Sequence, residues 1–499
     1  MSILKGSGGK LLAELHLDRS GGSPLHRQIY TQIRTMILNG QLPGGTRLPS
    51  TRTLCAELAV SRITLVNAFQ ALTGEGFLRS RTGDGTYVGD EWRKDFSFAP
   101  VNRRPELSVR AGLGTSARGS ELRKQALTSW NPEDSETFVA SQVGIDLFPS
   151  QTWKTLIARH SERPSIDMLG YGEPLGYLPL REAVAEYLRD SRGLNSTAEQ
   201  IVITTGAQQA FNALMLLMTD PGDQVWMEDP GHIAAAKVML ANGCTVHGVP
   251  IDEQGADLSA MEDFPAGRLM FLTPARQHPL GVRMSLARRM EWIAWANERN
   301  SWIIEDDSDS ELRYRGVHLP PLFGLDRGAH VVHVGSFSKV MFPSIRVGYA
   351  VLPDDLVQPF GAAISLTGRT PSTLIQATTA DFLRGGHLNS HIRRTRKIYE
   401  ARQAALLQEL HRQLYPFIQV DTVEAGMHVI ARLPPGIDDQ HLADELAYRG
   451  VYTYALGDYV LQQPAPPALL IGFAATEARR MSDAVGYMVR ALHHIGHRW

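Results

Sequence analysis

The chain has 499 residues, 43% of them hydrophobic and 20% charged, so it can form two or three packed domains and is neither disordered nor fibrous. Its two cysteines, Cys55 and Cys244, lie far apart without His or Cys neighbours at metal-ligand spacing, which argues against a disulfide framework or a zinc site. We find neither a signal peptide nor an apolar run near the ~20 residues that span a bilayer, and we expect a cytoplasmic protein without membrane contact.

The charges are unevenly distributed along the chain. Residues 1–125 contain 18 Lys and Arg against 10 Asp and Glu, whereas the remaining 374 residues contain 32 against 42. A basic front on an acidic body favours a polyanionic partner for the front, although a random surface bias would give the same numbers.

Residues 20–90 contain three segments with apolar residues at helical spacing. Ser23-Pro24 is a good start for the first helix, and Asn39-Gly40 is a good end for it. Ser50 and Ser61 have the side chains that cap helix N-termini, and each precedes one of the other two segments. The pattern predicts a helix-turn-helix whose third helix begins at Ser61 and can enter a major groove.

A hairpin is predicted directly after these helices. Residues 77–81 and 86–88 have the composition of short strands, and they flank Gly83-Asp84-Gly85. Asp-Gly between two short strands is a strong hairpin signal. This hairpin would form the wing of a winged helix-turn-helix.

Residues 91–131 lose the helical periodicity and mix Arg and Lys with Pro, Gly and Ser. This composition predicts a long, flexible, basic linker. The linker is either a simple spacer or a further contact to the DNA backbone.

Residues 132–499 form the third predicted region, in which short apolar segments alternate with helical ones. The apolar segments are 201–203, 225–227, 269–272, 302–304 and 331–334. Continuous apolar strands separated by helices are typical of a mostly parallel sheet that is covered on both faces. In such α/β domains the ligand lies beyond the carboxyl ends of the strands.

Polar residues gather at the ends of these expected strands. They are Ala207 and Gln208 at the start of a helix, Asp306 after one strand, Ser336, Ser338 and Lys339 after another, and Arg346 further along. A helix N-terminus, hydroxyls and a guanidinium suit a phosphate, whereas an amine and a carboxylate suit the aldehyde and the ring nitrogen of pyridoxal 5'-phosphate (PLP). Each signal is weak alone, but their order within one α/β domain predicts a PLP site.

The front resembles the GntR type of winged helix. The resemblance covers residues 24–88 in the segments LPSTRTL, VSRITLVNAFQAL and GFLRSRTGDGTYV. It implies contact with double-stranded DNA by Arg47, Arg52, Ser61, Arg62, Thr64, Thr82 and Gly83. Val66 stands where some members carry a further arginine, so the operator sequence does not follow from the resemblance.

The body resembles a fold-type I aminotransferase, and its fusion to a GntR winged helix resembles the MocR/GabR subfamily of GntR regulators. The matching segments are YGEPLGYLPLREAVAEYL, IVITTGAQQA, DPGDQVWMEDPG, WIIEDDSDSELRY and VGSFSKVMFPSIRVGY. The resemblance implies Lys339 as the Schiff-base lysine and Asp306 as the partner of the pyridinium nitrogen. It also implies phosphate contacts from Ala207, Gln208, Ser336, Ser338 and Arg346, with Tyr171 reaching in from a second subunit.

The sequence departs from the family pattern around this site. Ser308 replaces a tyrosine that hydrogen-bonds the cofactor ring, and His232 replaces a tyrosine expected against the ring. Leu470 lies in a segment without the arginine that grips a substrate carboxylate in many members, and Ala234 lacks the arginine of some amino-acid-sensing members. Gln277 is expected to face the ring, and Arg276 or Arg283 could replace the missing cation.

The residues expected to hold the phosphate and form the imine are retained, whereas those that tune the ring and bind an amino acid are altered. A working aminotransferase needs substrate placement and proton transfer as well as an imine. We therefore expect a transcription regulator that senses PLP or an amine, rather than an enzyme. The alternatives are a regulator with true aminotransferase activity and a cofactor-free regulator whose body only dimerises. The family resemblance implies a homodimer with exchanged heads and an operator of repeated half-sites.

Overall fold

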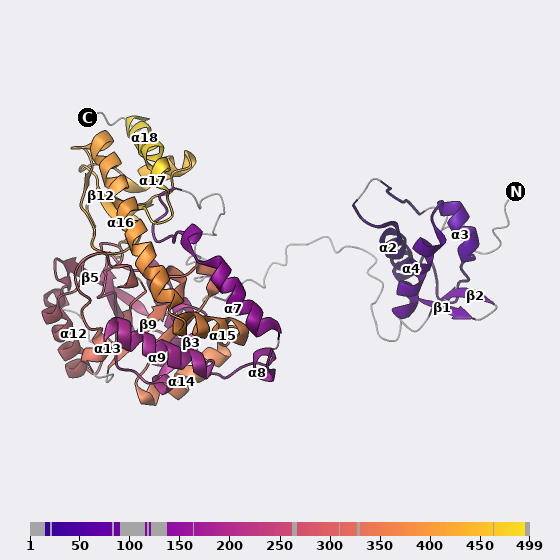
Figure 1. Cartoon of the computed structure of the whole chain (residues 1–499), viewed down its shortest axis with the longest axis horizontal. Coiled ribbons are helices and arrows are strands. Elements are labelled where there is room, and N and C mark those ends of the chain that lie inside the picture. The colour runs from indigo at the N-terminus through magenta and orange to yellow at the C-terminus, as the bar shows by residue number, and fades with distance from the viewer. Residues whose placement is uncertain are drawn as a thin grey trace. The chain divides into compact units, whose positions relative to one another are not determined.

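The computed structural model describes residues 15–19, 22–81, 84–89, 115–116, 119–120, 137–162, 164–261, 267–308, 310–326, 330–462 and 464–494. The chain divides into two compact units, Met1–Gly114 and Thr115–Trp499. We call the first unit the head and the second the body, and we describe each by itself (Figure 1). No helix in the described ranges is long and apolar enough to cross a membrane.

The head is a three-helix unit with a two-stranded hairpin. Its elements are α2 (Leu25–Leu38), α3 (Thr51–Leu58), α4 (Arg62–Gly74), β1 (Leu78–Arg81) and β2 (Gly85–Val88). Apolar residues at helical spacing form one buried core from all three helices, and Phe77, Leu78 and Val88 close it beside the hairpin. Ser50 and Ser61 cap α3 and α4 as predicted, each accepting a hydrogen bond from the N–H three residues later.

The body contains an eight-stranded sheet in the order β3-β10-β9-β8-β7-β4-β5-β6. The strands are β3 (Ile201–Thr204), β4 (Gln224–Asp229), β5 (Thr245–Asp252), β6 (Gly255–Ala256), β7 (Leu269–Leu272), β8 (Trp302–Asp306), β9 (Val331–Ser336) and β10 (Gly348–Val351). Neighbours from β5 to β9 pair in parallel, whereas β10 is antiparallel to both β3 and β9. The predicted mostly parallel sheet is confirmed.

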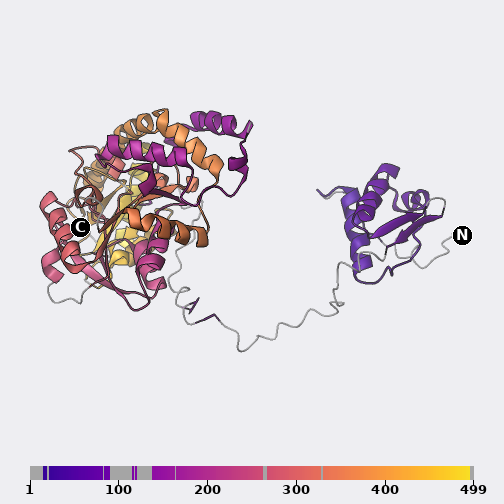
Figure 2. The same cartoon turned by 90° about the horizontal axis from the view of Figure 1, so that it is seen from below.

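Helices cover both faces of this sheet (Figure 2). The helices of this part are α7 (Ser150–Glu162), α8 (Ile166–Leu169), α9 (Leu178–Arg192), α10 (Ala207–Met218), α11 (Ile233–Ala241), α12 (Leu286–Arg299), α13 (Leu322–Leu325), α14 (Asp354–Leu366) and α15 (Thr373–Arg384). Alternate strand residues enter two separate cores, one with α10, α11 and α14 and the other with α9, α12 and α15. Ile304 belongs to the first core and Ile303 to the second, which fixes the direction of each side chain along β8.

The C-terminal part forms a smaller lobe that the sequence did not reveal. It contains α16 (His387–Leu414), α17 (Asp439–Tyr448), α18 (Ala478–His494), β11 (Gln419–Val420), β12 (His428–Arg432), β13 (Tyr454–Ala455) and β14 (Ala468–Gly472). The strands form an antiparallel sheet in the order β11-β12-β14-β13. The long helix α16 runs from the large sheet region into this lobe (Figure 1).

Candidate cofactor site and DNA-binding surface

One cavity of about 740 Å³ collects most of the predicted cofactor residues. It is lined by Ala140, Ser141, Ala207, Gln208, Phe211, His232, Ile233, Ala234, Lys237, Thr273, Arg276, His278, Asp306, Ser308, Ser336, Ser338, Lys339, Tyr454, Asp458 and Tyr459. The lining comes from the carboxyl ends of parallel strands, which is where an α/β sheet places its ligand. Tyr454, Asp458 and Tyr459 add a wall from the smaller lobe.

The N-terminus of α10 opens onto the cavity. Gly206 precedes the helix with a φ of 118°, a backbone conformation that favours glycine, and no side chain caps the helix. The first N–H groups of α10, including those of Ala207 and Gln208, are therefore available to an anion, and the helix dipole favours negative charge there. Beside them, Ser336 Oγ accepts a hydrogen bond from the N–H of Ser338 at 3.2 Å.

Lys339 ends a short 3₁₀ helix, Phe337–Lys339, directly after β9. Its Nζ donates a hydrogen bond to the carbonyl oxygen of Ser141 at 2.9 Å. Ser141 also lines the cavity, so the amine lies at the cavity wall rather than on the outer surface of the body.

Asp306 is the last residue of β8 and is 6% exposed at the base of the cavity. The N–H of Ser308 donates to Asp306 Oδ1 at 3.0 Å, and the Ser308 hydroxyl donates to the same oxygen. His232 Nε2 lies 4.0 Å from Asp306 Oδ2, while His232 Nδ1 accepts from the N–H of Ala235 at 3.2 Å and caps α11. Because Nδ1 accepts, a neutral His232 carries its proton on Nε2, facing the carboxylate.

Three imidazoles extend from the cavity into the body. The ring centroids of His232 and His278 are 5.3 Å apart, and those of His278 and His428 are 5.8 Å apart. Burial lowers the pKa of His278 and of His428 well below the usual value, and Arg276 and Lys339 lower both further. The imidazoles of His278 and His428 are therefore neutral and lie near the buried guanidinium of Arg276.

Arg276 lines the cavity and Arg283 does not. Arg276 is 5% exposed, and its Nε donates to the carbonyl oxygen of Ala425 at 3.1 Å. Arg283 is directed elsewhere, with Nη1 donating to the carbonyl oxygen of Val317 at 3.3 Å. Of the two candidate replacement cations, only Arg276 is at the cavity.

Three predicted cofactor residues are not among those that line the cavity. Gln277 is buried behind it, and its amide donates to the carbonyl oxygens of Pro230 and His278 at 2.8 Å each. Arg346 is exposed after a short turn and has a left-handed backbone with a φ of 51°. Tyr171 is 85% exposed, and the guanidinium carbon of Arg369 lies 4.5 Å from the centroid of its ring.

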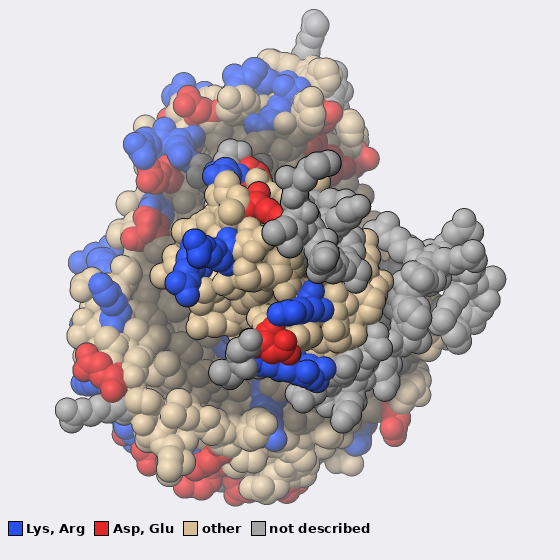
Figure 3. Space-filling model, turned by 90° about the vertical axis from the view of Figure 1, so that its right-hand side faces the viewer, with Lys and Arg blue, Asp and Glu red and all other residues tan. Residues whose placement is uncertain are grey.

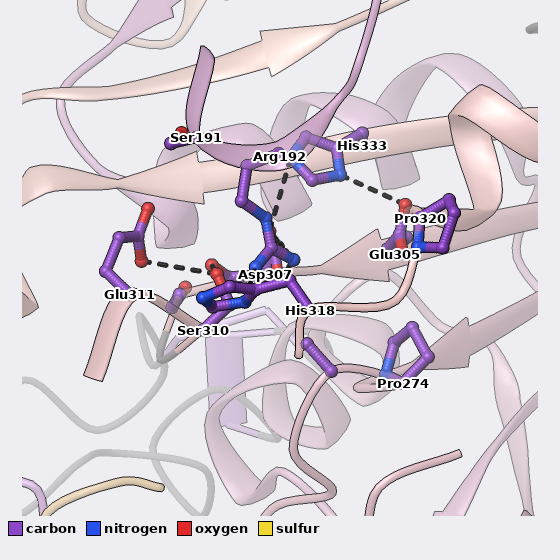
Figure 4. Close-up of polar contacts among 12 residues, drawn as sticks. Ser191, Arg192, Pro274, Glu305, Asp307, Ser310, Glu311, His318, Pro320 and His333 are labelled. Carbon is purple, nitrogen blue, oxygen red and sulfur yellow. Dashed lines mark hydrogen bonds and ion pairs between the residues drawn. The ribbon is translucent and has the colours of Figure 1, made fainter. Parts of the chain in front are cut away.

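A buried polar network lies behind Asp306, on the other face of β8 (Figure 4). Glu305 and Asp307 enter it because neighbouring strand residues point to opposite faces. Arg192 at the end of α9 donates to Asp307 Oδ1 at 2.8 Å and lies 2.7 Å from Oδ2. His333 Nδ1 lies 3.0 Å from Glu305 Oε2, and His333 Nε2 lies 3.8 Å from Asp307 Oδ2. These contacts fix the end of β8 and hold Asp306 toward the cavity.

Glu311 and His318 complete the network. Glu311 Oε1 accepts from the hydroxyl of Tyr187 at 3.1 Å, and Arg192 Nη1 lies 2.8 Å from His318 Nδ1. Burial, reinforced by the charge of Asp307, raises the pKa of Glu311 to about 7. Burial, with Arg192 next in effect, lowers the pKa of His318 to about 4. Sequence reasoning missed this network, since nothing in the order of the residues shows that α9 ends beside β8.

In the head, α4 presents the predicted recognition residues in its first turn. Arg62 is exposed there, and Arg52 is exposed on α3. Ser61 Oγ accepts from the N–H of Thr64 at 3.2 Å and lies 2.7 Å from Thr64 Oγ1, so this pair also fixes the start of α4. Ile63 is 70% exposed beside them and was not singled out from the sequence, because an isoleucine at a helix start is usually assigned to the core.

Arg47 is attached to the wing. Its guanidinium lies 3.9 Å from Asp84 Oδ1, donates to the Asp84 carbonyl oxygen, and lies 6.0 Å from the centroid of the Tyr87 ring. Thr82 and Gly83, the predicted wing contacts, are outside the described residues. Figure 3 looks onto the head and shows several groups of Lys and Arg side chains with fewer Asp and Glu among them.

Comparisons with known proteins find a family for the head and a family for the body. The family model "Bacterial regulatory proteins, gntR family" matches residues 25–88, and "Aminotransferase class I and II" matches residues 146–486. The probable rhizopine catabolism regulatory protein MocR of Rhizobium meliloti is 35% identical, over 94% of this chain and 94% of its own. The HTH-type pyridoxine biosynthesis transcriptional regulator PdxR of Corynebacterium glutamicum is 28% identical, over 93% of this chain and 96% of its own.

Among solved structures, the α-aminoadipate aminotransferase LysN of Thermus thermophilus is similar to the body. It matches with a TM-score of 0.66 and 27% identity, over 76% of this chain and 95% of that chain. That structure was determined in complex with N-(5'-phosphopyridoxyl)-L-leucine.

Proposed function

Because the chain belongs to the family of GntR-type transcription regulators that carry a class I and II aminotransferase domain, we propose that it binds duplex DNA through the head and PLP in the body, and that the state of the cofactor site alters DNA binding. The observation that carries the PLP assignment is the meeting of Lys339, Asp306 and the open N-terminus of α10 in one cavity. Ligand control of DNA binding requires that the ligand binds two arrangements of the protein with different affinity.

The residues at the cavity fit PLP. The α10 N–H groups, with Ser336 and Ser338 beside them, would hold the phosphate, and the Asp306 carboxylate would keep the pyridine nitrogen protonated. When bound, PLP supplies an electrophilic aldehyde that reversibly takes up primary amines, including the amine of Lys339. His232 would lie against the ring, because it lines the cavity and approaches Asp306.

Two further parts of this proposal come from the resemblance. Arg346 would reach the phosphate and Gln277 the ring only after a rearrangement of the side chains described above. Tyr171 would enter the site of a second subunit in a homodimer, and its high exposure supports this role. The effector would be PLP itself or an amine, and exchanged heads would read repeated half-sites.

Sensing is favoured over turnover by the contacts of Ser308 and Leu470. The Ser308 hydroxyl is already bonded to Asp306, so it does not replace the ring contact of a tyrosine. Leu470 is fully buried in β14 and packs with Ala140 and Leu456, so this position offers no cation to a substrate carboxylate. An amine could still enter and react with the aldehyde, but no cation at Leu470 would bind its carboxylate and position it for proton transfer.

Aminotransferase activity is the second candidate function, and Arg276 is the observation that favours it. This buried guanidinium lines the cavity, where it could receive a substrate carboxylate in place of the missing arginine. Purified protein loaded with PLP should be mixed with amino acids and an oxo-acid acceptor. Turnover well above that of Lys339→Ala would establish the activity, and Arg276→Gln would then raise KM.

The experiment that tests the proposal is an absorbance titration of the full chain with PLP. A visible-edge band should form, and borohydride should abolish it and leave a pyridoxyl group on Lys339. Lys339→Ala should give neither the band nor the adduct, and PLP should no longer change its affinity for a duplex selected by the wild-type protein. If the wild-type protein gives no band, the body is a cofactor-free scaffold and the proposal is wrong.

A further inference from the structure

A second hollow lies away from the cofactor cavity, along α16. It has a volume of about 620 Å³ and is open to solvent. Its lining residues are Tyr314, Arg393, Arg394, Arg396, Lys397 and Glu400. We call it the α16 hollow.

The cations of the α16 hollow share one side of a helix. Arg393, Arg396, Lys397 and Glu400 follow the spacing i, i+3, i+4 and i+7, which places side chains on one face. Arg393, Arg394 and Lys397 are exposed, and Arg396 is half-buried. Burial lowers the pKa of the Arg396 guanidinium.

None of the four cations of the α16 hollow forms an ion pair of 4.0 Å or less with a carboxylate in the described part of the chain. The Arg394 guanidinium donates to the carbonyl oxygen of Leu147 at 2.8 Å, and Arg396 Nε donates to the carbonyl oxygen of Glu311 at 2.6 Å. Neither these two nor Arg393 and Lys397 form an ion pair with a described carboxylate. Glu400 is the one acid among the residues that line the hollow, and its Oε1 is 3.1 Å from Arg315 Nη2.

Several buried arginines elsewhere in the body are paired with acids. Arg181, Arg288 and Arg402 lie 3.1 Å, 2.8 Å and 3.0 Å from carboxylate oxygens. Like charges at i and i+4 on a helix repel one another, so the stripe costs the fold free energy that a bound anion would recover. An anion supplied from outside the body would offset this repulsion.

We propose that the α16 hollow contacts the phosphate backbone of the DNA that the head binds. The proposal rests on DNA binding by the head, which brings a polyanion to the same molecule. The hollow is open and three of its cations are exposed, which suits a continuous backbone better than a small enclosed ligand. Arginine and lysine contacts of this kind add affinity without adding base specificity.

The test uses the full chain and a mixed-sequence DNA duplex. The variant Arg393→Gln/Lys397→Gln removes two exposed charges, and the one hydrogen bond of these side chains within the described residues is from Arg393 to the Ser390 hydroxyl at 3.4 Å. Loss of two phosphate contacts should lower the slope of log affinity against log salt by about 1.8. Between 50 and 200 mM salt, wild-type affinity should then fall roughly 12-fold further than the affinity of the variant.

The matched control is Lys154→Gln/Arg189→Gln, which removes two exposed cations from α7 and α9. It should keep the wild-type slope, and equal melting temperatures will show that both variants are folded. Equal slopes for the two variants would overturn the proposal, because the effect would then be one of net charge. A second measurement is the rise in melting temperature that inorganic pyrophosphate gives. If Arg393→Gln/Lys397→Gln keeps the wild-type slope but loses this rise, the hollow holds a small anion and the proposal is wrong. If the head does not bind DNA, and the proposed function is therefore wrong, Arg52→Ala will bind the duplex as tightly as the wild-type protein. This result differs from the two outcomes above, which concern only the α16 hollow.

Discussion

Replacement of Glu311 by Gln should remove a large part of the pH dependence of body stability. Burial raises the pKa of Glu311 to about 7 from an ordinary value of 4.5, so the folded state favours the protonated acid. A raised pKa contributes stability at low pH, and this contribution is lost as the pH rises from about 4.5 through about 7. Glutamine is uncharged at all pH values and can still accept the hydrogen bond from Tyr187.

The size of the effect follows from the shift. A rise of the pKa from 4.5 to about 7 corresponds to roughly 3 kcal/mol when the group is fully ionised, and most of this energy falls between pH 5 and pH 8. The negative charge of Asp307 adds to the raised pKa, so part of this energy belongs to both acids together. We expect Glu311→Gln to gain about 2–3 kcal/mol of stability relative to wild type as the pH rises from 5 to 8.

Urea denaturation of the two proteins at pH 5 and pH 8, followed by tryptophan fluorescence, measures this difference. Burial lowers the pKa of His278 and His428, so these residues contribute stability that is lost as the pH falls below the ordinary histidine value. Both proteins share these histidines, and their contribution cancels in the comparison. Parallel loss or gain of stability in wild type and variant would refute the buried, protonated state of Glu311.

Three other predictions test the site and the head. Arg192→Leu should cost about 3–5 kcal/mol of unfolding free energy because it leaves the buried Asp307 carboxyl without its cation. The double variant Arg192→Leu/Asp307→Leu should recover much of that loss in urea titrations. Asp306→Asn should weaken PLP binding in absorbance titrations, whereas Asp307→Asn should mainly lower the free energy of unfolding. Weaker PLP binding by Asp307→Asn, with Asp306→Asn affecting only stability, would contradict the opposite directions of the two side chains. Ile63→Ala should weaken binding to a selected duplex by about 1 kcal/mol if Ile63 packs against a thymine methyl, and unchanged binding would exclude that contact.

Much of the fold could be predicted from local sequence. The capping serines Ser50 and Ser61, the Asp-Gly hairpin signal and the short apolar segments of the sheet all depend on near neighbours, and their elements agree with the expectation. The antiparallel sheet of the smaller lobe was missed. Strands β11 and β13 have two residues each, too few to show an alternating pattern.

The site was predictable where its parts follow strand ends and unpredictable where they meet across the chain. Ala207, Asp306 and Lys339 could be placed together because parallel strands end at one edge of a sheet. Arg192 and His333 could not, because their contacts with β8 join helices and strands that are far apart in sequence. Ser308 is a departure from the family pattern in the sequence, but only the structure shows its hydrogen bond to Asp306.

The acidic run Glu305-Asp306-Asp307 shows why neighbouring residues of one type need not share a role. A strand turns each successive side chain to the opposite face, so Asp306 faces the cavity while Glu305 and Asp307 face the core with α9. Asp307 is matched by a buried arginine, and Glu305 by His333 and by the N–H groups of Leu322 and Phe323. Asp306 instead accepts hydrogen bonds from Ser308, two residues along the chain, and His232 approaches it from the cavity wall. Under the proposed function, this carboxylate, held in place from behind and facing the cavity, would meet the protonated pyridine nitrogen of PLP.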